Sequence, residues 1–150
     1  MDMNDERWRG RGVPVGREVV EYHWPYDGPH SPDHVVEAAS ALSALVRYLS
    51  NATRPGQASR TLPYAASVHG VLDGLGGAVG GVEQLLRQLI VVVRDQSAYV
   101  YDDRGDRPGS ATAAQLVARL SRVHGAVLGL GRELVAALEL SAHLGNRMGV

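Results

Sequence analysis

Four side chains of this 150-residue chain have the types and spacing of a divalent-metal site. His69 and Asp73 are four residues apart, as are Glu139 and His143, so each pair would lie on one face of a helix. In an antiparallel pairing of the two helices, His69 opposes His143. Asp73 then opposes Glu139, and helical bundles build metal sites from facing helices in this way. Two exposed ion pairs on helix surfaces would use the same residues, and we favour that interpretation.

Other groups capable of catalysis are scarce. His124 lies beside an apolar stripe, where a satisfied, partly buried histidine is more common than a catalyst. There is no cysteine, and all fifteen cationic residues are arginine, which excludes thiol nucleophiles, thiolate zinc sites and Schiff-base lysines. We therefore assign no catalytic residue, expect no cofactor and favour a non-enzymatic protein.

Residues 1–30 are expected to form an N-terminal arm that is partly extended or flexible, with one short strand over residues 13–22. Its charged segment places an aromatic ring among cations: Arg7, Trp8, Arg9 and Arg11. Such a segment could contact phosphates and stack on bases. Nearby acidic residues offset this charge, and the net charge of −1 gives no overall attraction to nucleic acid or membranes.

A first helix is predicted from Ser31 as N-cap, with Pro32 at the first helical position and Asp33 in the first turn. It ends before residues 54–56. Its apolar positions recur at steps of three and four, as on one helix face. They are Val35, Ala38, Leu42, Leu45 and Leu49.

Two longer helices follow, one from Pro63 to about residue 98 and one capped by Ser110. A charged turn over residues 102–109 separates them. The apolar stripe of the first comprises Tyr64, Val68, Val71, Leu75, Ala78, Val82, Leu85, Leu89 and Val92. That of the second comprises Leu116, Leu120, Val123, Val127, Leu130, Leu134 and Ala137. Two alternatives remain open: a helix break within residues 74–81, and strands over residues 89–93 and 99–101.

Glycines form a row beside each of these stripes. The first helix carries Gly70, Gly74, Gly77 and Gly81, and the second carries Gly125, Gly129 and Gly131. Each costs a helix up to about 1 kcal/mol relative to alanine, so the rows favour close approach of another backbone and helix packing there. A turn near residues 104 and 105 sets Gly80 opposite Gly129, which indicates that the glycines help to close an antiparallel hairpin.

The predicted fold class is all-α: an antiparallel hairpin of two long helices plus a shorter N-terminal helix, as a three-helix bundle over residues 31–150. By the rise of 1.5 Å per residue, the long helices span about 50 Å each and the short one about 28 Å. The short helix cannot cover both apolar stripes. Across residues 61–82 the only charged residue is Asp73, so a second copy of the chain is the simplest cover, and we expect a homodimer.

The function predicted from these features is that of a non-enzymatic helical assembly protein, which self-associates and presents a partner-binding surface. The alternative is a nucleic-acid-associated accessory or regulatory protein that uses the arginine-rich arm. Three of the first six residues are acidic and no apolar run follows them, which is not the pattern of a secretory signal. Charges interrupt the apolar stretches short of a membrane span. We therefore expect a cytoplasmic protein with no membrane partner.

Overall fold

The computed structural model describes residues 16–103 and 108–144 and confirms the all-helical fold class, since its described part contains only helices and loops. The chain divides into two compact units, Met1–Ala58 and Ser59–Val150. The helices of the first unit are α1 (Gly16–His23) and α2 (Pro32–Ala52), and those of the second are α4 (Ala65–Gln96) and α5 (Gly109–Ala142). A single-turn helix, α3 (Ala58–Thr61), lies at the boundary.

Helix α1 corrects the prediction of a strand over residues 13–22, because Gly16–His23 is helical. The valine pair at positions 19 and 20 suggested extended backbone. Arg17 and Glu21 are spaced for a helical pair, and Arg17 Nε donates to Glu21 Oε1 over 2.8 Å. That hydrogen bond, with the attraction between the two charges, raises the pKa of Arg17. The predictions for residues 1–15 lie outside the described residues.

Helix α2 begins where its capping residues predict. Ser31 has extended backbone, and its Oγ accepts a hydrogen bond from the backbone N–H of His34 over 3.2 Å. The helix ends at Ala52, two residues before the predicted break, and Gly56 then adopts a positive φ of 87°. The predicted stripe residues Val35, Leu42 and Leu45 are exposed.

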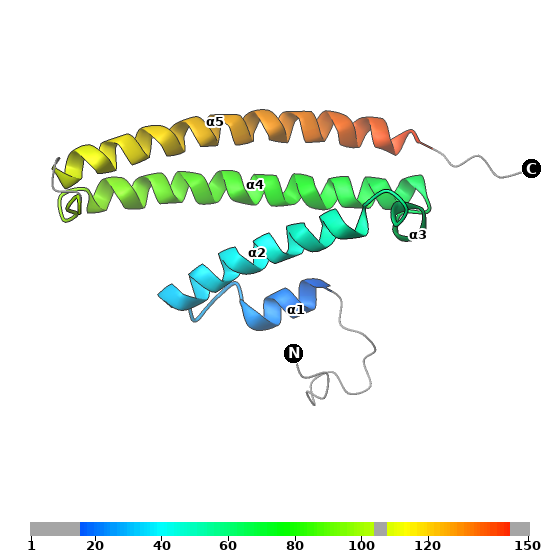
Figure 1. Cartoon of the computed structure of the whole chain (residues 1–150), viewed down its shortest axis with the longest axis horizontal. Coiled ribbons are helices and arrows are strands. Elements are labelled where there is room, and N and C mark those ends of the chain that lie inside the picture. Colours follow the sequence, from blue (N-terminus) through cyan, green and yellow to red (C-terminus); the bar gives the residue numbers. More distant parts are fainter. Residues whose placement is uncertain (1–15, 104–107, 145–150) are drawn as a thin grey trace, which may run out of the picture. The chain divides into compact units, whose positions relative to one another are not determined.

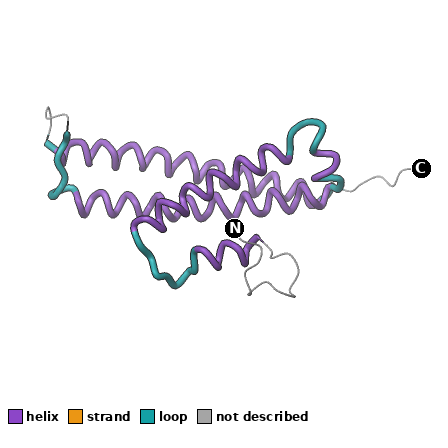
Figure 2. Tube along the Cα trace, turned by 60° about the horizontal axis from the view of Figure 1, so that its bottom comes forward, coloured by secondary structure: helices purple, strands orange, loops and turns teal. Residues whose placement is uncertain are grey.

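The second unit is an antiparallel hairpin of α4 and α5, which lie side by side along their whole length (Figure 1, Figure 2). Helix α4 runs without interruption through residues 74–81, which excludes a break there. Residues 89–93 belong to the same helix, and residues 99–101 form no strand. The apolar positions stay in helical phase across the glycines, and the contact of Val79 with Gly131 of α5 continues the helix packing through this stretch.

We call the row of residues along which α4 and α5 face each other the seam. On α4 it comprises His69, Leu72, Gly76, Val79, Glu83, Leu86, Ile90 and Val93. On α5 it comprises Ala113, Val117, Leu120, His124, Val127, Gly131, Leu134, Leu138 and Ser141. All of these residues are buried or half-buried, and steps of three and four separate them, as in a coiled-coil hairpin.

Three cross-helix contacts fix the register of the hairpin. His69 meets Ser141, Glu83 meets His124, and Val79 Cγ1 lies 3.7 Å from the position that a Cβ would take at Gly131. The predicted register, with Gly80 opposite Gly129, is therefore correct to within one helical turn.

The predicted stripes do not coincide with the seam. On α4 each stripe residue precedes a seam residue by one position, and Val68, Leu85 and Leu89 are 38–46% exposed. On α5 the stripe alternates between seam residues and the residue before a seam residue, of which Val123 and Leu130 are about half exposed. The reason is that the apolar sector of each helix is wider than the contact with one neighbour. Polar residues occupy part of the seam, so the pattern of apolar residues did not indicate which positions face the other helix.

Helix α5 begins earlier than predicted, with Pro108 as N-cap and Gly109 as its first residue, so Ser110 lies inside the first turn. Gly109 is required there because a Cβ would overlap the backbone carbonyl of Val100. One turn later, Thr112 Oγ1 donates a hydrogen bond to the carboxylate of Asp102. These contacts join the preceding loop to the start of α5.

Candidate interaction surface

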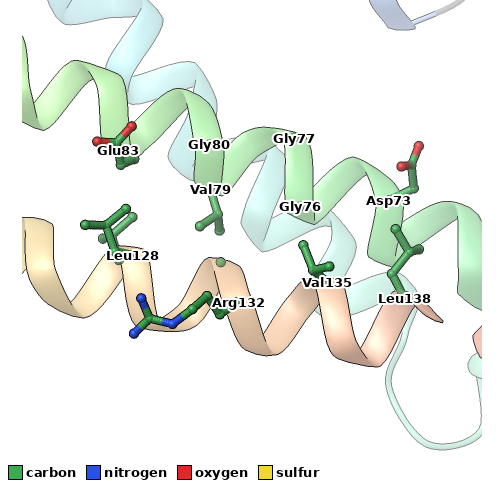
Figure 3. A pocket seen from close by; sticks show the side chains of 12 residues that line it. Asp73, Gly76, Gly77, Val79, Gly80, Glu83, Leu128, Arg132, Val135 and Leu138 are labelled. Carbon is green, nitrogen blue, oxygen red and sulfur yellow. The ribbon is translucent and has the colours of Figure 1, made fainter. Parts of the chain in front are cut away.

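A groove of about 600 Å³ runs along one side of the hairpin, between α4 and α5 (Figure 3). Its apolar lining comprises Gly76, Gly77, Val79, Gly80, Val127, Leu128, Gly131, Val135 and Leu138. Its charged lining comprises Asp73, Glu83 and Arg132. Successive helical residues are separated by 100°, so the residue after each seam position turns toward this side.

The predicted stripes lie on the opposite side of the hairpin. Their α4 residues and the outer α5 residues come one position before the seam, which rotates them away from the groove by the same 100° step. Only Val127 belongs to both a predicted stripe and the groove lining. We call this second surface the apolar side, and it exposes Val68, Leu85, Leu89, Leu116, Val123 and Leu130. The hairpin thus has two long surfaces of different chemistry.

The charges of the groove are divided between its walls. Asp73 and Glu83 belong to α4 and lie toward the two ends of the groove, whereas Arg132 belongs to α5 and lies between them (Figure 3). Within the described residues, neither the side chain of Asp73 nor that of Arg132 has a hydrogen-bond or ion-pair partner. The groove therefore presents one carboxylate, that of Asp73, and one guanidinium, that of Arg132, which are available to another molecule.

Glu83, by contrast, is bound within the hairpin. Its Oε1 lies 2.6 Å from His124 Nε2 and 2.9 Å from Arg87 Nε, and the side chains of Glu83 and His124 are each 21% exposed. The prediction that His124 is a partly buried, satisfied side chain is confirmed. The sequence reasoning missed Glu83, although a glutamate two heptads after His69, inside an apolar stretch, is a signal of a polar pair in the seam.

The four predicted metal ligands do not converge. His69 faces Ser141 rather than His143, and its Nδ1 lies 2.8 Å from Ser141 Oγ. Because Ser141 Oγ donates to the carbonyl of Leu138 over 2.7 Å, it accepts from the Nδ1–H of His69. Asp73, Glu139 and His143 are exposed. Within the described residues, no group of three or more histidine and carboxylate side chains is placed to hold a metal ion.

Most of the predicted glycines do not contribute to the contact that closes the hairpin. Gly70, Gly74, Gly77, Gly81 and Gly125 are exposed, and no atom lies within 4 Å of a Cβ built on any of them. At Gly129 the nearest such atom belongs to the guanidinium of Arg132, at 4.0 Å. The displacement of the seam by one residue turns these glycines outward, and Gly77 thereby lines the groove. Of the predicted glycines, Gly131 does lie at the helix-helix contact, where it meets Val79.

Two other predictions concern nucleic acid and membranes. The candidate nucleic-acid contacts, at positions 7, 8, 9 and 11, lie outside the described residues. Helix α4 is long and apolar enough to cross a membrane by length and composition, with an 18-residue window of mean hydropathy 1.2. This corrects the prediction that charges interrupt every apolar stretch short of a span. One such helix is weak evidence for a membrane protein, because core helices of soluble proteins meet the same criterion.

The fold and the surface together define an all-helical protein built on a long antiparallel hairpin. Comparison with protein families, curated proteins and solved structures finds no match to this chain.

Proposed function

We propose that this chain is a non-enzymatic helical interaction protein that self-associates through its hairpin, as a homodimer. The observation that carries the proposal is the small core beside a large exposed apolar surface. Within the described residues, Ile90 and Ala113 are the only buried hydrophobic residues, 8% and 6% exposed. Both helices of the hairpin expose valines and leucines along their length.

Exposure of this kind favours association, because full burial of one large apolar side chain in an interface contributes about 1.5–3 kcal/mol to the free energy of association. Within its own unit, a hairpin of two helices in contact leaves most of each helix surface without a neighbouring helix. Monomeric proteins rarely expose apolar patches larger than a few hundred Å². A second copy that covers one side of the hairpin would supply the neighbours that the core lacks.

The size of the hairpin also suits a dimer. Helix α4 has 32 residues and α5 has 34, so each is about 50 Å long. With about 10 Å for the width of each helix, one side of the hairpin presents roughly 950 Å². A standard stable interface buries about 800 Å² per partner, so one side is sufficient.

The mass of the full chain in solution tests the proposal. Sedimentation velocity and light scattering are expected to give twice the mass of the 16.0 kDa chain at micromolar concentration. The thermal midpoint should rise with protein concentration, because association stabilises the folded state by mass action. A mass of one chain up to about 100 μM, where even a weak interface of about −5.5 kcal/mol would be half occupied, would refute the proposal.

A further inference from the structure

We propose that the groove is the surface at which a second copy of this chain docks, with Arg132 of each copy paired with the partner's Asp73. The inference rests on the proposed self-association and goes beyond it by assigning the surface and the pairing. Asp73 lies on the α4 wall and Arg132 on the α5 wall of the groove.

Charge complementarity identifies the occupant. The α4 wall carries the unpaired carboxylate of Asp73 and the α5 wall carries the guanidinium of Arg132, so the groove is itself the complement of a second groove turned about a two-fold axis. If that axis runs along the hairpin, each α5 lies over the partner's α4. Arg132 of each copy then meets Asp73 of the other, twice in one dimer.

The register of the hairpin sets the axial positions of the pair. The contacts His69–Ser141 and Glu83–His124 place Asp73 at the level of residues 134–137 of α5. Arg132 lies two to five residues from that level, which is about 3–8 Å along the helix axis. An axis along the hairpin preserves these levels in the partner. An arginine side chain spans that offset, so Arg132 reaches the partner's Asp73 without a shift of either helix.

The lining of the groove permits close docking. Gly76, Gly77 and Gly80 place no side chain between the α4 backbone and an approaching helix, and no atom lies within 4 Å of a Cβ built at any of them. Leu128 and Val135 line the α5 wall and are 43% and 55% exposed. A partner helix would bury these two side chains against the glycine backbone. Apolar burial and two ion pairs then act together over one surface.

Charge reversal tests the pairing in the full chain. Arg132→Asp and Asp73→Arg, made singly, place like charges together twice per dimer and should each raise the dissociation constant about tenfold or more. The double variant D73R/R132D restores opposite charges and should return the constant to within about threefold of the wild-type value. Arg119→Asp is the matched control, since Arg119 is an exposed arginine of α5 outside the groove lining, and it should leave the constant unchanged.

Cross-linking gives a second measurement, which the absence of cysteine makes selective. A short bis-maleimide cross-linker, which replaces the length of the arginine side chain that a disulfide could not span, should join D73C and R132C chains in a mixture, whereas it should not join D73C to R119C. Wild-type self-association that both single reversals leave unchanged would overturn the docking proposal and keep self-association. A wild-type chain that stays monomeric would overturn both. Circular dichroism of every variant verifies that the helices remain folded.

Discussion

Replacement of the outward glycines of α4 by alanine should stabilise the protein. Gly74 lies inside a 32-residue helix, is exposed, and has no atom within 4 Å of an added Cβ. Alanine there removes the conformational entropy of glycine at no steric cost, so Gly74→Ala should add about 1 kcal/mol to the free energy of unfolding. Gly70 and Gly81 are equivalent sites outside the groove, and the triple variant should gain about 3 kcal/mol.

Replacement of Gly109 by alanine should lower the free energy of unfolding, so this position serves as the control for the glycine-to-alanine change. A Cβ at this position overlaps the carbonyl of Val100, and the atoms that must move belong to the backbone. The loop before α5 would have to shift, and the hydrogen bond between Thr112 and Asp102 would be strained with it. Gly109→Ala should therefore cost about 1–3 kcal/mol, in the range of other overpacked sites.

Urea denaturation followed by circular dichroism measures both effects. All variants should be compared at one protein concentration, because association adds to the apparent stability. A gain of about 1 kcal/mol corresponds to an increase of about 2–4 °C in the thermal midpoint for a chain of this size. Loss of stability in Gly74→Ala would show that another backbone packs against the glycine row and would refute the assignment of these glycines to an open surface.

Two further predictions concern the polar pair in the seam and the arm. Glu83→Ala leaves His124 without its partner in a half-buried position and should cost about 1–2 kcal/mol, whereas Glu133→Ala at an exposed site should change the denaturation midpoint little. If the arginine-rich arm binds nucleic acid, fluorescence anisotropy with single-stranded RNA should show an affinity that falls steeply with salt and is lost on deletion of residues 1–12. An affinity for RNA that persists after the deletion would refute the hypothesis that the arm binds nucleic acid.

Local signals in the sequence predicted where the helices begin and end better than they predicted which face of each helix contacts the other. The cap at Ser31 and the start of α4 within two residues of Pro63 follow from backbone groups that a nearby side chain or a proline ring must accommodate. The register of the hairpin followed from the position of its turn alone. Each of these features depends on residues close in the chain, which is why one sequence was sufficient to predict them.

The phase of the seam was not predictable by the same means. A helix whose apolar residues extend over more than one contact does not reveal which of them its neighbour covers. His69 and Glu83 hold seam positions because Ser141 and His124 satisfy them from the other helix, and a hydrophobicity pattern scores such positions as exposed. The error of one residue had a large consequence, because it turned most of the glycines from the contact to the outside.

The two sides of the hairpin differ in what they can specify. The apolar side offers side chains such as Leu116, Val123 and Leu130, which gain free energy from burial against any apolar surface at nearly any axial position. The groove adds unpaired charges at defined levels, and an offset partner would leave Asp73 or Arg132 desolvated without a counter-charge. Burial on the apolar side therefore contributes affinity with little selectivity. The groove has the chemistry to select one partner in one register, and its charge pattern is complementary to a second copy of itself.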